Sequence, residues 1–422
     1  MATSPVSNRE GHRSSTSNTE RFPLPETLSP CFNVRRSCAM LMKNELVSGF
    51  AVSKVETDYL SSVERRSVDI NTEKLNALAQ TIAAAVSSSS SPAFIEWDEH
   101  EWHYTASSDI CRTHFTPEER EERVALYILT LDALNFCFWP APGLEYEHLA
   151  TALKLIAQQD EQELVLNNSS LLSTAGNWNS QNYALSPVNL STITSEKLHQ
   201  MLKPHLPAGV DTLPNLDERC RLCNEVGTGL LYHFNGSVLA MIQQAQQSAE
   251  RLVQIIVNTF SGFRDTVIDD VGRQVFFYKR AQILVGDLWA SLGNSTAYCN
   301  FYDIDRLTMF ADYRVPQLLR HEGVLVYSST LANKVDRGQI LVAGCMDELY
   351  IRAATVVAVE QMVQVIKDIF APNSSEHKDR NVATSPDYWC AIKLDWHLWQ
   401  VGEKLNQEGS LSKHHLVRTI FY

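Results

Sequence analysis

Apolar residues recur at helical spacing in one long segment after another, and this pattern constrains the fold of the 422-residue chain more than any other feature. Residues 71–86 show the spacing clearly. A second helix should begin at a capping box formed by Thr116 and Glu119, with Pro117 in its first turn. Signals for strands are limited to short pieces such as 274–278. We therefore expect a mainly helical protein with minor short strands.

The same spacing predicts most of the other elements. Further helices are expected at 117–134, 278–292, 315–321, 347–369 and 387–401. One long helix should begin near Gly236 and Ser237 and continue past Ile256. Two segments lack the pattern: residues 1–30 are rich in Ser, Thr, Pro and Asn, which predicts a disordered tail, and residues 158–192 have the composition of an insertion loop.

The composition excludes several classes of protein. Hydrophobic residues make up 44% of the chain and charged residues 20%, which excludes disorder over most of its length. A net charge of −13 repels polyanions, so we expect a small-molecule ligand and no stable nucleic-acid partner. The sequence contains neither a signal-peptide core nor an uninterrupted apolar run of membrane-spanning length. These features predict a cytoplasmic or nuclear protein with no membrane partner, and we expect a monomer.

The cysteines predict neither disulfides nor a metal site. Nine cysteines, mostly scattered singly, in a chain without a secretion signal are typical of reduced thiols. Cys220 and Cys223 have the spacing of a metal knuckle, but a tetrahedral zinc site needs two further ligands and no second pair follows. We interpret the pair as small apolar side chains on a helix, and we expect no metal and no cofactor.

Acids and aromatic residues occur together in four segments, in the combination that surrounds a flat heterocycle in a pocket. The segments are 131–140, 277–289, 308–319 and 394–399. Asp395 lies between Leu394 and Trp396, where an unpaired buried carboxylate would cost about 3–5 kcal/mol. Asp395 must therefore be hydrogen-bonded or functional.

Two other charged residues allow a structural and a functional interpretation. Asp312 either caps the short helix that follows it or binds a ligand. Lys279 follows three aromatic residues, an unusual position for a surface ammonium, although a salt bridge with Asp287 would explain it. From spacing alone the chain is either a carboxylate enzyme acting on a heterocycle or a helical binding protein. Motifs for NTPases, dinucleotide-dependent enzymes, zinc proteases and serine hydrolases are absent from the sequence.

Eight segments, in order along the chain, resemble the queuosine salvage protein family. They are LDALNFCFWP (131–140), HFNGS (233–237), SGFRDT (261–266), FFYKRAQILVGDLW (276–289), LTMFADYRVPQLLR (307–320), YIRAATVVAVE (350–360), LDWHLW (394–399) and HHLVRTIFY (414–422). The resemblance implies a single helical domain, residues 31–422, similar to helix-hairpin-helix DNA glycosylases. It also implies a hydrolase that cleaves the N-glycosidic bond of queuosine 5′-phosphate and releases queuine for reuse in tRNA modification. The alternative is a non-catalytic helical protein that binds a nucleoside or tRNA.

The resemblance implies roles for individual residues. Asp395 would face the anomeric carbon, either as the nucleophile or as the group that orients water, because both roles need a carboxylate in nearly the same place. Asp312 would accept hydrogen bonds from the guanine-like edge of the base, and Phe310 would stack on its ring. His114 and Trp396 would line the pocket.

Other groups would bind the outer parts of the substrate. Gln400 stands at a position that looks acidic in relatives, and its amide can bond the aminocyclopentenediol group of the base. The candidates for the 5′-phosphate are Lys279, Arg314 and the backbone amides at Gly236 and Ser237.

Overall fold

A computed structural model describes residues 29–43, 66–88, 94–166, 183–371 and 382–422 of the chain. Its α-helices are α1 (Pro30–Lys43), α3 (Thr72–Ser88), α4 (Asp109–His114), α5 (Pro117–Leu134), α6 (Tyr146–Leu166), α7 (Pro187–Thr192), α8 (Ser195–Leu202), α9 (Leu216–Phe234), α10 (Val238–Gln244), α11 (Ala249–Thr259), α12 (Lys279–Leu292), α13 (Arg314–His321), α14 (Ser329–Asp336), α15 (Met346–Phe370) and α16 (Ala391–Gln407). The strands are two or three residues long. The prediction of a mainly helical fold with short strands is confirmed.

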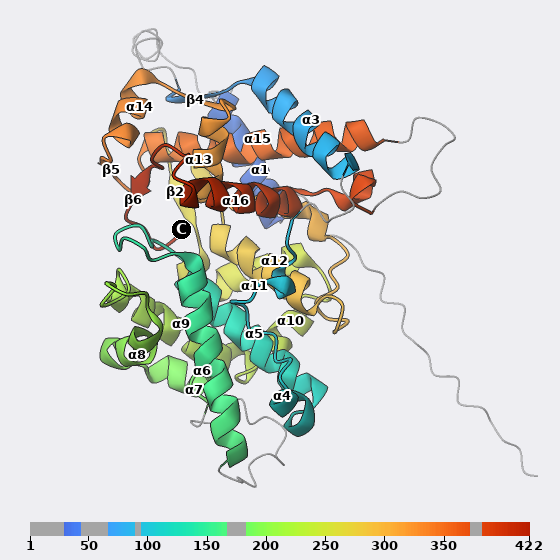
Figure 1. Ribbon diagram of the computed structural model, residues 1–422, viewed down its shortest axis with the longest axis vertical. Coiled ribbons are helices and arrows are strands. Elements are labelled where there is room, and N and C mark those ends of the chain that lie inside the picture. The colour runs from blue at the N-terminus through green and yellow to red at the C-terminus, as the bar shows by residue number, and fades with distance from the viewer. Residues whose placement is uncertain (1–28, 44–65, 89–93, 167–182, 372–381) are drawn as a thin grey trace, which may run out of the picture.

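The helices form an upper and a lower group (Figure 1). In the upper group α15 packs against α1, α3 and α16, and α16 packs against α13. In the lower group α5 packs against α6, α9, α10 and α12. The end of the chain, marked C in Figure 1, lies between the two groups. Segments far apart in the sequence therefore meet where the two groups face each other.

Three small sheets connect the helices. β1 (Val68–Ile70) pairs antiparallel with β4 (Leu325–Tyr327), and β2 (Thr266–Ile268) forms a hairpin with β3 (Gln274–Phe276). β5 (Ile340–Leu341) pairs in parallel with β6 (Leu416–Val417), which holds the C-terminal segment against the body of the protein.

The predicted capping box opens α5, the central helix of the lower group. The Thr116 hydroxyl accepts from the Glu119 amide at 3.2 Å, and the Glu119 carboxylate accepts from the Thr116 amide at 2.8 Å. Every residue from Glu122 to Leu134 is buried, so this helix is enclosed on all sides instead of burying a single apolar stripe. Its C-terminal end carries the chain into the interior of the protein.

α15 is the corresponding central helix of the upper group. Among the described residues it is the one helix that is long and apolar enough to cross a membrane, but 67% of its apolar window is buried inside the protein. It also carries Glu348 and Arg352, which are both buried and lie 3.8 Å apart. Burial of this kind is expected of a core helix in a large helical protein.

The prediction of an insertion loop at 158–192 is wrong at both ends of this range, because α6 continues to Leu166 and α7 spans Pro187–Thr192. Residues 167–182 lie outside the described residues. Asp160 shows why composition misled: it is buried, and its carboxylate accepts from the Ala184 amide at 2.8 Å. A polar residue in a Gln-rich stretch therefore makes an interior contact between α6 and the turn that precedes α7.

The single long helix expected from Gly236 onward is instead two helices, α10 and α11. Gln246 and Gln247 adopt left-handed backbone angles with φ of +53° and +62°, which ends α10. Ser248 then caps α11, and its hydroxyl donates to Asp303 at 2.6 Å. The apolar period continues across the break, so the pattern alone did not reveal it.

Three statements on domain organisation stay predictions. The expected tail, 1–30, lies outside the described residues except for Ser29, which is buried, and Pro30, which begins α1. The single domain at 31–422 and the likeness to helix-hairpin-helix DNA glycosylases are likewise predictions.

Candidate active site

A pocket that is partly open to solvent is lined by residues of both helix groups. Its aromatic lining includes Trp97, Trp102, Phe310, Tyr313, Trp396 and Trp399. Its ionisable lining includes Glu145, Lys279, Asp287, Asp312, Asp395 and Glu403. Large flat side chains with a few acids fit an aromatic heterocycle of nucleotide size.

Two helices present whole faces to this pocket. α16 contributes Asp395, Trp396, Trp399, Gln400 and Glu403. α12 contributes Lys279, Ile283 and Asp287. Both sets follow the three-to-four residue spacing of one helix face, so the local helix geometry aligns these side chains without help from loops. Gly286 adds to this, because a Cβ there would lie 3.2 Å from the Phe310 ring.

Residues 94–103, which we call the aromatic strap, close one side of the pocket. Trp97 and His103 stack with ring centroids 3.8 Å apart, and His100 and Trp102 stack at 4.3 Å. His103 Nε2 lies 3.0 Å from the Tyr146 hydroxyl, which ties the strap to α6. Burial lowers the pKa of His103 to about 3, so this imidazole is neutral at physiological pH.

Gln400 holds the strap from the opposite side. Its amide oxygen accepts from the Ile95 amide at 2.9 Å, and its amide nitrogen donates to the Ile95 carbonyl at 2.8 Å. Both ends of the side chain are therefore engaged by backbone. These bonds hold the strap in place. The role in binding the base that the sequence led us to expect for Gln400 stays a prediction.

Asp395 and Asp312 are each held by one oxygen. Asp395 Oδ1 accepts from the Phe310 amide at 3.1 Å. Asp312 Oδ1 accepts from the amides of Arg314 and Val315, at 3.0 and 3.1 Å, and so caps the start of α13. Neither Oδ2 makes a hydrogen bond with the described residues. Each carboxyl group is thus fixed in orientation and keeps one oxygen for a ligand, so that Asp312 can fill both roles considered for it.

The electrostatics of the pocket are dominated by buried acids. Burial, and then repulsion from Asp312, raise the pKa of Asp395 well above its ordinary value, although the Phe310 amide and Lys279 lower it. Burial also raises the pKa of Asp312, with Lys279 as the main opposing influence. Burial raises the pKa of Asp287 to about 7. Burial therefore disfavours the ionised forms of all three acids, and a cationic centre in a ligand would favour them.

A second cluster of charges joins Arg314, which does not line the pocket, to Glu145 and Glu403, which do. Arg314 Nε donates to Glu403 at 2.7 Å, and Arg314 Nη2 lies 3.7 Å from Glu145. A further bond of 2.6 Å joins Arg314 to Gln317. The guanidinium is fully occupied by these partners, which weakens its candidacy for the phosphate.

The burial of Asp287 leads to a prediction about stability. Its folded pKa of about 7 lies above that of an unfolded aspartate, so the folded state must hold an unfavourable charge at high pH. Relative to the wild type, Asp287→Asn should become more stable as pH rises from about 4 to about 7, and then level off. The gain is roughly 1.4 kcal/mol for each pKa unit of the shift. Urea unfolding at several pH values measures it.

The control for this prediction is Asp336→Asn. Hydrogen bonding to Arg320 lowers the pKa of this largely exposed carboxyl group, so its substitution should show no gain between pH 4 and 7. A flat pH dependence of the Asp287→Asn difference would contradict the burial argument.

Of the site residues predicted from the sequence, Lys279, Phe310, Asp312, Asp395, Trp396 and Gln400 line the pocket, whereas His114 and the phosphate candidates Arg314, Gly236 and Ser237 do not. His114 is exposed on the last turn of α4, and its Nδ1 lies 3.1 Å from the Ile110 carbonyl. The neighbouring Phe115 turns its ring into the core, so His114 faces solvent. The structure gives His114 no place in the site.

The anion site expected at Gly236 and Ser237 is filled by the protein itself. Glu122 accepts from the Ser237 hydroxyl at 2.7 Å and from the Val238 and Leu239 amides at 2.5 and 3.1 Å. An internal carboxylate thus satisfies the N-terminus of α10, and the segment does not line the pocket.

Asp287, Glu403 and the aromatic strap line the pocket but were not predicted to belong to the site. Asp287 follows Lys279 by eight residues and Glu403 follows Asp395 by eight, a spacing that places each pair on one helix face. That signal was available in the sequence. The strap has no periodic pattern, and only its density of Trp and His would have drawn attention to it.

The chain matches a family model described as queuosine salvage protein over residues 114–422. The chain belongs to the queuosine salvage protein family. A relative from Dictyostelium discoideum, named queuosine 5′-phosphate N-glycosylase/hydrolase, is 40% identical over 301 residues, which cover 71% of this chain and 79% of the relative. A protein of the same name from Sphaerobacter thermophilus is 36% identical, with 71% and 82% covered, and one from Mus musculus is 28% identical, with 78% and 89% covered. Within the queuosine salvage family, these names favour an enzyme over the non-catalytic alternative.

Proposed function

We propose that this protein hydrolyses the N-glycosidic bond of queuosine 5′-phosphate and releases queuine for salvage into tRNA modification. The observation that carries the proposal is the pocket in which Asp395 and Asp312, each with one oxygen unengaged by protein, lie among stacked aromatic walls. Relatives named queuosine 5′-phosphate N-glycosylase/hydrolase support the reaction. We further propose that the protein acts as a monomer in the cytoplasm or nucleus.

Asp395 has the properties that cleavage of a ribosyl C–N bond requires. As the bond to the base lengthens, positive charge develops at the anomeric carbon, and a carboxylate close to it stabilises that charge. Burial raises the pKa of Asp395, so a bound cationic centre would stabilise its ionised form more strongly than water would. The oxygen of water then bonds to the anomeric carbon and the water loses a proton to solvent, while the electron pair of the broken bond leaves with the base, whose ring nitrogen takes up a proton from solvent.

Asp312 and Phe310 fit recognition of the base. Queuine is a 7-deazaguanine, so carbon replaces the ring nitrogen that purine glycosylases protonate, and activation must come from elsewhere on the base. The Asp312 carboxylate can accept from the amino group and ring N–H of the guanine-like edge. Phe310 lines the pocket two residues earlier, on the backbone that also bonds Asp395.

Lys279 is the best placed of the phosphate candidates. It is 5% exposed, and its ammonium makes no ion pair within 4 Å in the described part of the chain. Arg314 is occupied by Glu403 and Glu145, and Gly236 and Ser237 lie outside the pocket lining. A buried cation that lacks a close partner is well suited to a phosphate dianion.

The first test is the reaction itself. Purified protein incubated with queuosine 5′-phosphate should release free queuine, detected by mass spectrometry. Intact tRNA that carries queuosine should release much less, because the net charge of −13 opposes binding of a polyanion. Comparable release from intact tRNA would show that the mononucleotide is not the preferred substrate.

The second test addresses Lys279. Lys279→Met should raise the KM for queuosine 5′-phosphate roughly 10- to 100-fold, since a hydrogen bond to a charged group is lost. Cleavage of queuosine without its phosphate should change far less. Steady-state kinetics with both substrates measures the difference. Equal losses for queuosine 5′-phosphate and queuosine would mean that Lys279 interacts with the acids of the pocket and does not bind the phosphate.

A further inference from the structure

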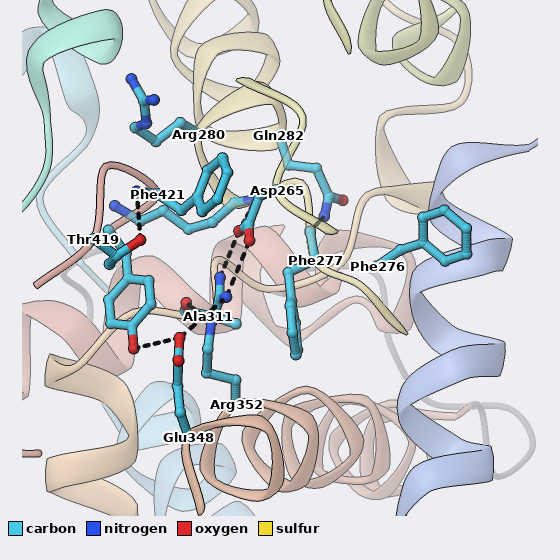
Figure 2. A network of polar contacts seen from close by, with 12 residues as sticks. Asp265, Phe276, Phe277, Arg280, Gln282, Ala311, Glu348, Arg352, Thr419 and Phe421 are labelled. Carbon is cyan, nitrogen blue, oxygen red and sulfur yellow. Dashed lines mark hydrogen bonds and ion pairs between the residues drawn. The ribbon is translucent and has the colours of Figure 1, made fainter. Parts of the chain in front are cut away.

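Arg352 on α15 does not line the pocket, but its guanidinium contacts Tyr422, which does. Figure 2 shows Arg352 among Asp265, Phe277, Ala311 and Glu348. Its two terminal nitrogens donate to the two oxygens of Asp265 at 3.0 and 2.5 Å, and its Nε donates to the Ala311 carbonyl at 3.0 Å. The rings of Phe277 and Tyr422 lie 3.9 and 4.4 Å from its Cζ. The side chain is 1% exposed, so these contacts hold it on all sides.

The contact with Asp265 controls the start of α12. The Asp265 carbonyl accepts from the amides of Phe277 and Tyr278 at 3.0 and 3.1 Å, and its carboxylate accepts from the Lys279 amide at 3.3 Å. Tyr278 has a φ of +51°, a left-handed conformation that a bulky residue adopts only when its surroundings impose it. Asp265, held by Arg352, imposes the turn from which Lys279 enters the pocket.

The contact with Ala311 controls the segment that carries Asp312. The Ala311 carbonyl belongs to the peptide group that leads into Asp312, so its bond to Arg352 fixes the orientation of that peptide. One residue earlier, the Phe310 amide donates to Asp395. Residues 310–312 are therefore held from one side by Arg352 and from the other by Asp395.

A third contact reaches Tyr422, which lines the pocket. The Tyr422 hydroxyl donates to Glu348 at 2.9 Å, and Glu348 lies 3.8 Å from Arg352 (Figure 2). Arg352 thus connects three parts of the chain that are far apart in sequence.

We propose that Arg352 is a positioning residue for the reaction: through Asp265 and Ala311 it sets the placement of Lys279 and Asp312 relative to each other. The proposal rests on the proposed function. Only a planar guanidinium can bond both oxygens of Asp265 while its Nε reaches a carbonyl, because a lysine presents a single nitrogen. Displacing a catalytic group by about 1 Å costs on the order of 100-fold in rate.

The test is a double-mutant cycle on kcat/KM for queuosine 5′-phosphate. Arg352→Lys should lower kcat/KM about 100-fold in the wild-type background. In the Asp312→Ala background the same substitution should lower it by a clearly smaller factor, because one of the two groups that Arg352 positions is already absent and only the effect through Lys279 remains. A purely structural role would reduce activity by the same factor in both backgrounds, and that result would overturn the proposal, as would an unchanged kcat/KM for Arg352→Lys.

Arg320→Lys is the matched control. Arg320 also bonds both oxygens of an aspartate, Asp336, at 2.8 and 3.0 Å, and lies over the ring of Tyr327, but none of the three lines the pocket. The kcat/KM of the Arg320→Lys variant should stay within twofold of the wild-type value. If Arg352→Lys fails to fold, Asp265→Asn replaces it in the cycle, with the same expected and contradicting results. Absence of queuine release by the wild type would reject the proposed function, whereas normal release by the variants rejects only the role of Arg352.

Discussion

Replacing Asp395 by asparagine should abolish release of queuine from queuosine 5′-phosphate. We expect kcat to fall by about 1,000-fold or more, because the variant loses the charge that stabilises the developing cation at the anomeric carbon. The shape of the side chain is kept, and its remaining oxygen can still accept from the Phe310 amide. Mass spectrometry of free queuine over long incubations measures the residual rate.

The fold of the Asp395→Asn variant should survive. Burial raises the pKa of Asp395, which means that ionisation of this carboxyl group destabilises the folded state. The neutral amide should therefore leave the thermal stability equal or higher. Asp368→Asn, the same change at an exposed position of α15, is the control and should leave turnover unaltered. Turnover of the Asp395→Asn protein at the wild-type rate would remove the mechanistic assignment.

The second large effect is expected at Asp312. Asp312→Ala should lower kcat/KM about 100-fold or more, because the guanine-like edge of the base loses its charged acceptor. Part of this loss could come from α13, since the same carboxylate caps that helix through Arg314 and Val315. Asp312→Asn separates the two effects, because its amide oxygen can still cap the helix while its charge is gone.

A substrate analogue that lacks the exocyclic amino group sharpens this test. Wild-type protein should cleave the analogue far more slowly than queuosine 5′-phosphate, because the Asp312 carboxylate would be left without its partner in a buried site. The Asp312→Ala variant should lose this discrimination and treat both substrates alike. Retained discrimination in the variant would place recognition of the amino group on another residue.

Much of the helical scaffold was predictable because it depends on local chemistry. The Thr116 and Glu119 capping box and the apolar spacing after it identified α5 from neighbouring residues alone. The break between α10 and α11 was not predictable, because it depends on Asp303, about fifty residues further along the chain, accepting from Ser248. His114 shows a related limit: a short local match cannot tell which side of a helix end faces the pocket.

The sequence by itself determined the helical class of the protein, the family to which it belongs and the candidate residues Lys279 on α12 and Asp395 and Trp396 on α16, because helical periodicity and motif order are encoded by neighbouring residues. Only the tertiary structure decided which polar groups are free to meet a ligand. Glu122 fills the N-terminus of α10, Gln400 bonds the strap and Arg314 is occupied by acids, while Lys279 keeps its ammonium unpaired among the described residues. A buried polar group must find a partner, and the partners of these groups lie far away in the sequence, so the assignment can be made only after the chain has folded.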